Sequence, residues 1–571
     1  MFTLGHSLVF ILIKKILIIA ALFLNTAYGQ ITQQKQVLWI STSLNEKPQI
    51  TTLAGLEAMT APITGLYYIT TDAGKYGIWW YDAKDITSSD NGGTIKVSSN
   101  GKRFKRIIQD NIVLASWFLD SLPGTTLQTE KFQAAINAAQ YKKLVLPSNY
   151  TFYTEQVNLV SYTHIIGDKT IIKTPSSSPL GSRLVQASTV SRVILNNIEF
   201  DLSNVTLGNE NNGTCPVAFE AGCSYITIKN LYIHNSHFVA IKIVGSSFVD
   251  VSYNRIYNTD AGIHLLDEGL FTCRNVYIHH NNIDGTTTPG ENTSEGISIS
   301  PQVQNVRFKK IRVTDNFVKN KTESQGISFF GVEDGLVEGN IIVNCLEGIA
   351  ISLRDEVPKS QPYEPHSKKV FVINNRIISA LNFGIRGQAD DALISGNIID
   401  NTGGTAISTA RGYGKPSTTL LSERMTISKN IINKIGRAGT GGNGGIQITN
   451  LNNSKILDNQ IRTNKSTASF YGIRWSGKYG TGNIIKRNTC DWIFSWVETA
   501  GTQDFSSFNE VSENTFHSLS NFRPDYSLTN AWKIKNNTLT IRRSTSTLKK
   551  AKKIPDNSPN RSAKAVKRTG N

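Results

Sequence analysis

The residues best suited to chemistry fall between positions 354 and 415. Arg354, Arg386 and Arg411 could neutralise the carboxylates of an acidic substrate through charge-assisted hydrogen bonds. Proton-exchanging side chains accompany them, and an elimination reaction on an acidic sugar needs this combination: a neutralised carboxylate, a base and an acid. We therefore predict catalytic roles for the arginines Arg354 and Arg386. We predict the same for three side chains that can exchange protons, His366, Tyr413 and Lys415. We predict that Arg411 and Tyr363 bind the substrate.

Four carboxyl groups in the same region suit a different reaction. Hydrolysis of a glycosidic bond uses two carboxyl groups, about 5 Å apart for retention or about 6.5–9.5 Å apart for inversion. Asp390 and Asp391 are the catalytic candidates for this reaction, and Asp355 and Glu356 are predicted to line the same site. The residue types leave elimination and hydrolysis both open, and we favour elimination.

A repeated phrase shows which elements must position these residues. "GNIIVNCLEGIAIS" (339–352) is nearly repeated by "GNIIDNTGGTAIS" (396–408). An Asn followed by an apolar strand recurs every 22 to 35 residues, at Asn230, Asn254, Asn281, Asn316, Asn340, Asn375, Asn397, Asn430, Asn459, Asn488, Asn514 and Asn537. Period-2 alternation without a helical stripe predicts a solenoid of short parallel strands. Each Asn is expected to hydrogen-bond to its copies in the neighbouring coils.

The strand that contains Gly-Ile-x-Ile predicts one face of this solenoid. Its isoleucines should point into the core, so the residue between them should point outward. Read coil by coil, the outward residues are Lys242, His264, Ser298, Ser328, Ala350, Arg386, Ser408, Gln447 and Arg474. We predict that Lys242, His264 and Arg474 contact the substrate. Insertions at 355–369 and 411–424 follow this strand and should form walls around the coil of Arg386.

The repeat region, Asn230–Leu539, resembles the right-handed parallel β-helices of the pectate-lyase-like superfamily. Gly77–Ile107 resembles the small β-rich module that precedes such helices, and Thr129–Leu159 resembles their cap helix and first strands. The resemblance implies an all-β fold, a single-stranded right-handed parallel β-helix of about 12 or more coils with an N-terminal cap helix and a small β-rich module. The capping helix is expected because an open end exposes core and unpaired strand edges.

The same superfamily contains lyases, hydrolases, epimerases and non-catalytic adhesion or tail proteins, so the fold does not select among them. The resemblance implies Ca²⁺ as a frequent cofactor of the lyases, while the sequence itself indicates none. Lyase and epimerase signatures are absent here, which favours a non-catalytic glycan-binding or adhesion protein as the alternative. Our leading interpretation is a carbohydrate-active enzyme that cleaves a long, acidic polysaccharide, by β-elimination in preference to hydrolysis.

The ends of the chain predict export and a free tail. Lys14 and Lys15 precede an apolar run that is too short for a membrane span, followed by small residues typical of signal-peptide cleavage. The net charge is +17, of which the tail 541–571 carries +9 and is expected to be disordered. The predicted regions are a signal peptide (1–29), a β-rich module (30–110), a cap with entry strands (111–160), a β-helix (161–540) and the tail (541–571). We expect a secreted, periplasmic or cell-surface protein, a monomer or trimer that binds neither nucleic acid nor membrane after cleavage.

Five cysteines do not make a disulfide framework. Only Cys215 and Cys223 are close in sequence, and one bridge between them would suit an oxidising compartment. Neither the Cys nor the His spacing is typical of structural zinc, so we predict no metal ligands.

Overall fold

The computed structural model describes most of the chain between residues 48 and 553. The described ranges are 48–120, 123–176, 182–205, 214–267, 270–285, 294–301, 306–351, 367–409, 422–436, 444–462, 471–475, 480–491, 494–496, 509–518, 532–541 and 552–553. The predicted signal peptide and nearly all of the basic tail lie outside them. The chain forms two compact units, one of Met1–Asp110 with Ser116–Ser121, the other of Asn111–Ala115 with Leu122–Asn571.

The first unit is a small β-sheet domain. Five strands in the order β1-β2-β3-β5-β4 form its sheet: β1 (Gln49–Thr51), β2 (Tyr67–Thr70), β3 (Gly77–Tyr81), β4 (Ile95–Val97) and β5 (Arg103–Arg106). One helix accompanies them, α2 (Leu53–Ala58). Their apolar side chains form a core of Leu56, Leu66, Tyr68, Trp79 and Phe104. The predicted β-rich module is therefore present.

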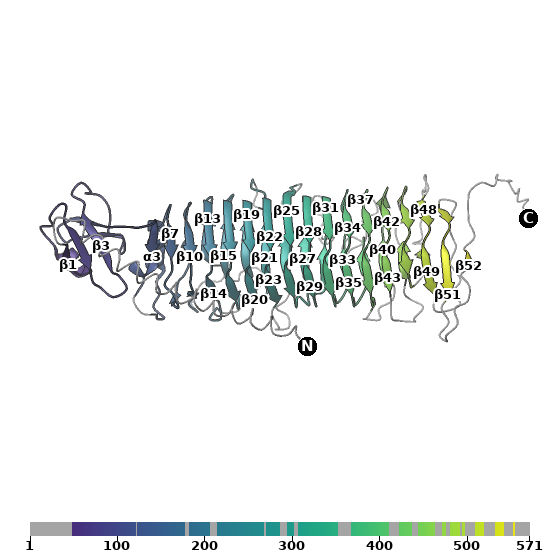
Figure 1. Cartoon of the computed structure of the whole chain (residues 1–571), viewed down its shortest axis with the longest axis horizontal. Coiled ribbons are helices and arrows are strands. Elements are labelled where there is room, and N and C mark those ends of the chain that lie inside the picture. The colour runs from purple at the N-terminus through teal and green to yellow at the C-terminus, as the bar shows by residue number, and fades with distance from the viewer. Residues whose placement is uncertain are drawn as a thin grey trace, which may run out of the picture. The chain divides into compact units, whose positions relative to one another are not determined.

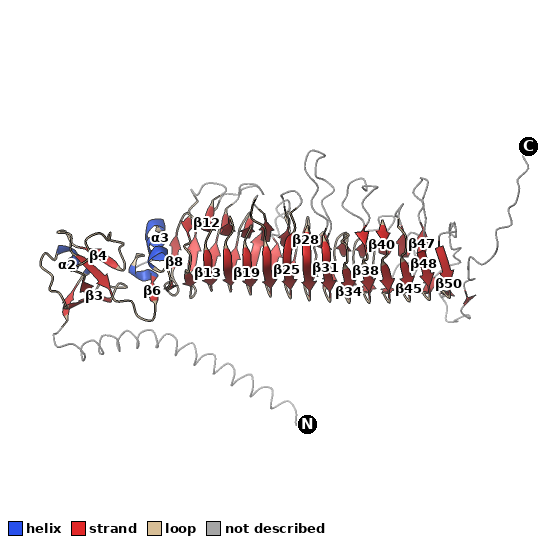
Figure 2. Ribbon diagram, turned by 90° about the horizontal axis from the view of Figure 1, so that it is seen from above, coloured by secondary structure: helices blue, strands red, loops and turns tan. Residues whose placement is uncertain are grey.

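The second unit is a solenoid built from three long sheets of parallel strands (Figures 1 and 2). Sheet 1 contains β6 (Ile112–Leu114), β7 (Lys143–Val145), β10 (His164–Ile166), β13 (Ser191–Asn196), β16 (Ser224–Lys229), β19 (Ser247–Ser252), β22 (Arg274–His279), β25 (Phe308–Thr314), β28 (Val332–Glu338), β31 (Lys368–Ile373), β34 (Leu393–Ser395), β38 (Thr426–Ser428), β42 (Lys455–Leu457), β45 (Ile484–Lys486), β48 (Asn509–Ser512) and β50 (Trp532–Lys535).

Sheet 2 contains β8 (Thr151–Tyr153), β11 (Ile171–Lys173), β14 (Glu199–Asp201), β17 (Tyr232–His234), β20 (Arg255–Thr259), β23 (Asn282–Gly285), β26 (Phe317–Lys319), β29 (Ile341–Val343), β32 (Arg376–Ile378), β35 (Ile398–Asp400), β39 (Ile431–Asn433), β43 (Gln460–Arg462), β46 (Thr489–Cys490), β49 (Thr515–Ser518), β51 (Thr538–Ile541) and β52 (Lys552–Lys553). The last of these strands runs antiparallel to its neighbour.

Sheet 3 contains β9 (Val157–Asn158), β12 (Arg183–Ser188), β15 (Cys215–Glu220), β18 (Val239–Val244), β21 (Ala261–Leu266), β24 (Ile297–Ile299), β27 (Gln325–Phe329), β30 (Glu347–Ala350), β33 (Ile385–Arg386), β36 (Ile407–Ser408), β40 (Gly444–Ile448), β44 (Tyr471–Trp475) and β47 (Phe494–Trp496). A separate short pair joins β37 (Ser422–Glu423) to β41 (Leu451–Asn452). A complete coil contributes one strand to each sheet in turn, as β34, β35 and β36 do. More than a dozen strands per sheet confirm the predicted coil number.

An asparagine ladder occupies the corner between sheets 1 and 2. From Asn254 to Asn514, each side-chain Nδ2 donates to Oδ1 of the ladder Asn in the next coil, at 2.9–3.0 Å, and Asn537 ends the ladder as an acceptor. All of these side chains are buried. The predicted ladder is confirmed, with one correction. Asn230 lies one residue before the ladder position, which Leu231 occupies, because Tyr232 pairs with Arg255.

The predicted cap helix is α3 (Thr129–Ala138), which buries Phe132, Ala135 and Ile136 as its helical spacing predicted. Gln133 of this helix also forms hydrogen bonds with the main chain of β9, the first strand of sheet 3. The Gln133 side-chain Nε2 donates to the Asn158 carbonyl at 2.8 Å, and the Asn158 N–H donates to the Gln133 Oε1 at 2.7 Å. The side-chain amide therefore replaces a neighbouring strand at the first coil, which protects an exposed edge from pairing with other chains.

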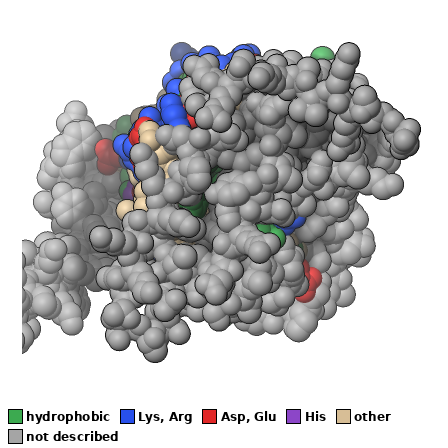
Figure 3. Space-filling model, turned by 90° about the vertical axis from the view of Figure 1, so that its right-hand side faces the viewer, with side chains coloured by type: hydrophobic (Ala, Val, Ile, Leu, Met, Phe, Trp, Pro, Cys, Tyr) green, Lys and Arg blue, Asp and Glu red, His purple; other side chains and the backbone are tan. Residues whose placement is uncertain are grey.

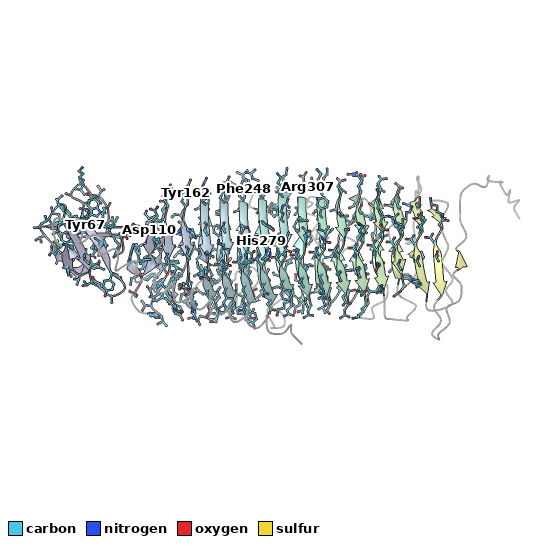
Figure 4. All side chains as sticks on the ribbon, viewed as in Figure 1. Tyr67, Asp110, Tyr162, Phe248, His279 and Arg307 are labelled. Carbon is cyan, nitrogen blue, oxygen red and sulfur yellow. The ribbon has the colours of Figure 1, made fainter. Side chains whose placement is uncertain are left out.

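Aromatic side chains stack along the corner that leads into sheet 1. Figure 4 labels two of them, Tyr162 and Phe248, on the same edge of the solenoid. Tyr141 stacks on Tyr162 with ring centroids 4.6 Å apart, and Tyr225 stacks on Phe248 at 4.8 Å. The Arg192 guanidinium lies over the rings of Tyr162 and Tyr225. All five residues have positive φ angles of 55–64°, a conformation that bulky residues rarely adopt. Stacking from coil to coil offsets part of this backbone cost.

All five cysteines are buried free thiols. The bridge between Cys215 and Cys223, which the sequence left open, is not formed. The Sγ atom of Cys215 donates to the Val217 carbonyl, and that of Cys223 to the Glu220 carbonyl, so each thiol has its own main-chain partner. Burial raises the pKa of Cys215 to about 11, which keeps this thiol protonated at neutral pH. In the part of the chain that the structure describes, no helix has the length and apolarity needed to cross a membrane.

We expect Asn397→Ala to lower the free energy of unfolding by about 2–3 kcal/mol, because several buried partners lose their hydrogen bonds. Asn397 donates to Val372 O and to Asn430 Oδ1 and accepts from Asn375. Thermal or denaturant unfolding measures the change. Lys455→Ala, on an exposed position of β42, is the control and should change the free energy by less than about 0.5 kcal/mol. Equal effects of the two substitutions would contradict a stabilising ladder.

Candidate active site on the outer face of sheet 3

The outward column predicted from the sequence is present on sheet 3. Successive strands pair in a register that aligns Lys242, His264, Ser298, Ser328, Ala350, Arg386, Ser408, Gln447 and Arg474. The isoleucines on either side of this column, such as Ile263 and Ile297, are buried in the core. In the middle of the column the outward side chains are buried as well, including Ser298, Ser328 and Arg386.

Eight of the predicted site residues lie outside the described residues. They are Arg354, Asp355, Glu356, Tyr363, His366, Arg411, Tyr413 and Lys415. Their roles stay predictions. The remaining six, described below, are Lys242, His264, Arg386, Asp390, Asp391 and Arg474.

Arg386 forms a buried ion pair with Glu347. Its Nε lies 2.8 Å from Glu347 Oε1 and 3.0 Å from Oε2, and the Glu347 side chain is completely buried. The guanidinium also lies over the Phe383 ring at 5.8 Å. Glu347 belongs to the preceding coil of sheet 3, so the ion pair joins two coils. A buried ion pair must be well arranged, because each charge loses its hydration.

Glu347 belongs to a second column that the sequence interpretation missed. The residue before Gly-Ile is Glu295 in one coil, Gln325 in the next and Glu347 in the third. Gln325 pairs with Glu347 in register, and its Nε2 donates to Glu347 Oε2 at 3.4 Å. Glu295 is buried, with a side chain 9% exposed. The signal was present in "SEGISIS" and "LEGIAIS", where a carboxylate precedes an otherwise apolar strand.

His264 contacts this second column. Its Nε2 lies 3.8 Å from Glu295 Oε2 and makes no hydrogen bond among the described residues. Burial lowers the pKa of His264 to about 4, although the Glu295 carboxylate opposes the shift. The imidazole is therefore neutral at pH 7.

A fully buried lysine lies close to the same site. The Lys321 Nζ donates to the carbonyl oxygens of Thr259, at 2.9 Å, and Asp260. Burial lowers the pKa of Lys321 to about 8. Its positive charge contributes, after burial itself, to the lowered pKa of His264.

Lys242 belongs to a more accessible polar cluster at the N-terminal side of His264. Its Nζ lies 3.2 Å from Glu220 Oε1, and Arg183 Nε lies at the same distance from that oxygen. Gln186 donates to the other carboxylate oxygen at 3.1 Å. Burial opposes the shift, but Lys242 and Arg183 together hold the pKa of Glu220 below its usual value. The cluster presents one carboxylate and two basic groups along the sheet.

Asp390 and Asp391 lie in the turn that leads from β33 to β34. Asp390 Oδ1 accepts a hydrogen bond from the Glu423 main chain at 3.0 Å. Asp391 has a positive φ of 53° and forms an ion pair with Arg424, which lowers the pKa of its carboxyl group. These contacts stabilise the turn between β33 and β34. Glu295 and Glu347, by contrast, lie on sheet 3 within the coils between His264 and Arg386.

Arg474 ends the described part of the predicted column. It pairs in register with Gln447, and its guanidinium lies over the Tyr471 ring at 5.5 Å. The following Trp475 is buried, as expected for an inward residue of this strand.

A cavity of about 480 Å³ lies on a different sheet. It is lined by Gln460, Ile461, Arg462, Thr489, Asp491 and His517, which come from β43, β46, β49 and the residue after β46. Figure 3 views the solenoid from this C-terminal end. The cavity belongs to the outer surface of sheet 2, so it is separate from the predicted site.

The described residues were compared with the ligand set of a calcium ion. Calcium takes six to eight oxygen ligands. Across the ranges that the structure describes, no three His, Cys, Asp or Glu side chains are grouped so that they could hold a metal ion. Glu347 already forms an ion pair with the Arg386 guanidinium.

Two family descriptions match the chain. "Phage tail protein small four-stranded beta-sheet domain" matches residues 47–109, which lie within the first unit. "Right handed beta helix region" matches residues 185–317 and 215–361 in the solenoid. No curated protein is similar enough in sequence to match.

Several solved structures are similar to the chain. The catalytic unit of an α-1,3-glucanase from Streptomyces thermodiastaticus is 15% identical, with a TM-score of 0.51 over 68% of this chain and 73% of that one. The surface adhesin PfbA of Streptococcus pneumoniae is 19% identical, with a TM-score of 0.47 over 64% and 91%. A tailspike of an E. coli bacteriophage, in complex with a pentasaccharide, is 13% identical, with a TM-score of 0.46 over 80% and 81%. At these identities the likeness concerns the fold alone.

The lowered pKa of His264 predicts a specific pH dependence. Between pH 6.5 and about 4 the unfolded chain binds a proton at this residue and the folded chain does not, so stability falls as the pH falls through this window. His264 should contribute a loss of up to about 3 kcal/mol. We expect the stability of the wild type relative to His264→Gln to decrease between pH 7 and pH 4, measured by denaturant unfolding. A difference that stays constant over this range would contradict the buried, neutral imidazole.

Proposed function

We propose that this protein, a right-handed parallel β-helix with the pectate-lyase-like fold, binds a long polysaccharide along the outer face of sheet 3 and hydrolyses it. Glu295 and Glu347 are the proposed pair of catalytic carboxyl groups. We further propose that the protein acts outside the cytoplasm, as the signal-like N-terminus indicates. The observation that carries the proposal is the placement of both carboxyl groups in one column on this face.

The main chains of the two residues are separated by slightly more than the upper limit that inverting hydrolases set for their carboxyl groups. Glu295 and Glu347 lie two coils apart, so their main chains are separated by about 9.6 Å. Inverting enzymes hold their two carboxyl groups about 6.5–9.5 Å apart, which leaves space for a water molecule. Gln325 lies between them and fixes Glu347 by a hydrogen bond. The separation exceeds the distance of about 5 Å that retention requires.

The surroundings assign different roles to the two groups. Glu347 forms an ion pair with the Arg386 guanidinium, and we assign it the role of the base that activates water. Glu295 lies 3.8 Å from His264, and we assign it the role of the acid that protonates the leaving oxygen. Arg386 and His264 then act as positioning residues.

The ion pair also supports hydrolysis over the elimination that we expected from the sequence. Elimination needs an arginine or another cation directed at the substrate carboxylate. Arg386 instead directs its Nε at Glu347, at 2.8 and 3.0 Å. An acidic substrate stays a prediction that rests on the basic residues of this face, such as Lys242 and Arg474.

One observation favours a second candidate function. The Glu347 side chain is completely buried, and a buried ion pair between coils also fits a purely structural role. In that case the face binds a glycan without cleaving it, and the accessible cluster of Arg183, Glu220 and Lys242 supplies the contacts. The protein would then be an adhesion or glycan-binding protein.

The test is turnover of a panel of acidic and neutral polysaccharides by the wild type, Glu295→Gln and Glu347→Gln. We expect new reducing ends without the ultraviolet absorbance of unsaturated products, and at least about a 100-fold loss of turnover in either variant. Glycan binding, measured by affinity electrophoresis, should be retained. Glu338→Gln, a half-buried position on sheet 1, is the matched control and should retain full turnover.

Three results would contradict hydrolysis by this pair. Ultraviolet absorbance together with reducing ends would indicate elimination. Binding without turnover in the wild type would indicate an adhesion protein. A lower melting temperature of Glu347→Gln, with turnover retained by the folded fraction, would assign the ion pair a structural role.

A further inference from the structure

The cavity at the C-terminal end of sheet 2 lies on a different sheet from the proposed hydrolase site. Its volume of about 480 Å³ falls within the range of about 300–1,000 Å³ that is usual for small-ligand pockets. The floor is apolar, because Ile461 is 2% exposed and points into the core. The other described lining side chains are polar or charged, namely Gln460, Arg462, Thr489, Asp491 and His517. The lining therefore suits a small polar ligand.

Strand register places the three ionisable side chains of this cavity in one column. Three inward side chains pair in successive coils, namely Ile461, Cys490 and Phe516. The residues that follow them are Arg462, Asp491 and His517. Side chains alternate along a strand, so these three point outward, and successive members are about 4.8 Å apart along the solenoid. A carboxylate is therefore flanked by a guanidinium in the preceding coil and an imidazole in the next.

Arg462 is the cation that this column offers to a ligand. Its side chain is exposed, and within the described ranges its guanidinium makes no hydrogen bond or ion pair. A guanidinium binds a carboxylate or a phosphate through two parallel hydrogen bonds. Arg487 does so within the chain, where its Nε and Nη2 donate to the two oxygens of Asp458 at 2.7 and 3.0 Å. Arg462 can offer the same pair of donors to an anion from outside the chain.

The other lining groups select among anions. Asp491 places a negative charge next to Arg462, which disfavours a dianion such as phosphate because like charges repel each other at this spacing. A carboxylate only accepts hydrogen bonds, so Asp491 suits the hydroxyl groups of a ligand. Gln460 and Thr489, which pair in the neighbouring outward column, can both donate and accept. The cavity therefore matches a ligand with one carboxylate and several hydroxyl groups, which is the chemistry of a sugar acid.

We propose that this cavity binds a sugar-acid unit, such as a uronic acid residue of a polysaccharide. Arg462 binds the carboxylate of that unit, and Asp491 accepts hydrogen bonds from its hydroxyl groups. A glycan bound here contacts sheet 2, whereas Glu295 and Glu347 belong to sheet 3. The site goes beyond the proposed hydrolase function and does not depend on whether sheet 3 cleaves its substrate.

The experiment is protection of Arg462 from phenylglyoxal, a reagent that modifies exposed guanidinium groups. The whole chain is treated with the reagent, and the modified arginines are mapped by mass spectrometry. D-glucuronate, D-galacturonate and D-mannuronate are tested at about 50 mM, well above a Kd in the millimolar range. We expect at least one of them to slow the modification of Arg462 at least about tenfold by mass action. Arg376, likewise exposed on sheet 2 but outside the cavity, is the matched internal control and should react at an unchanged rate.

Two further probes separate the parts of the ligand. D-glucose has the hydroxyl groups without the carboxylate, and inorganic phosphate has the negative charge without the sugar hydroxyls. Each should protect Arg462 at least about tenfold less than the best uronate, because each loses one set of hydrogen bonds to a charged group.

A variant tests the contact with the hydroxyl groups. Asp491→Ala should raise the concentration of uronate needed for protection at least about tenfold, because the charged acceptor is lost. Glu513→Ala removes an exposed carboxylate in the coil of His517 but outside the cavity, and should be protected like the wild type. The wild-type experiment decides the existence of the site even if Asp491→Ala does not fold.

Each other outcome overturns the proposal. Modification of Arg462 at the same rate with and without all three uronates removes the site. Equal protection by glucose makes the ligand a neutral sugar, and equal protection by phosphate makes it a simple anion. Equal slowing at Arg376 shows that the effect is not specific to the cavity. Unchanged protection in Asp491→Ala removes the contact assigned to this carboxylate.

Discussion

The asparagine ladder is the interaction on which the rest of this structure depends. Each Asn amide bonds to the ladder Asn of the next coil and to a main-chain carbonyl one strand away, as Asn397 does with Asn430 and Val372. A side chain that slipped by one residue would lose both partners and turn every strand of its coil inside out. The ladder therefore fixes the register of each coil against its neighbours.

A fixed register turns single positions into columns. On sheet 3 it stacks Lys242, His264 and the serines in one line, and Glu295, Gln325 and Glu347 in another. Chemical groups from strands that are tens of residues apart are held about 4.8 Å or a multiple of it from each other. A site with two carboxyl groups at a defined separation is a direct product of this geometry, and a rigid scaffold keeps that separation constant.

The outer faces of the sheets differ in their side chains, although the backbone of every coil is similar. Sheet 3 buries polar and charged groups that neutralise each other across coils, such as Arg386 with Glu347. Sheet 2 exposes isoleucines such as Ile341 and Ile398. Because the coils are so similar, the differences arise from one or two residues per strand. A solenoid can in this way hold a polar site and an apolar surface in the same coils.

The sequence by itself determined the parallel-strand solenoid, its minimum coil number and the outward column of sheet 3, because these follow from the repeat and from alternation within single strands. The right-handed β-helix and its cap helix were implied by the family resemblance. It misplaced Asn230 by one residue, because only the pairing of Tyr232 with Arg255 sets the corner. The pairing of Glu295 and Glu347 with His264 and Arg386 came from tertiary structure alone. A residue before Gly-Ile faces outward or inward according to the bend at the corner, which the local pattern does not encode. Likewise Cys215 and Cys223 are close in sequence, yet each thiol bonds to a different main-chain carbonyl. Strand alternation is local and can be read from the sequence, whereas contacts between coils depend on how far each turn advances the chain.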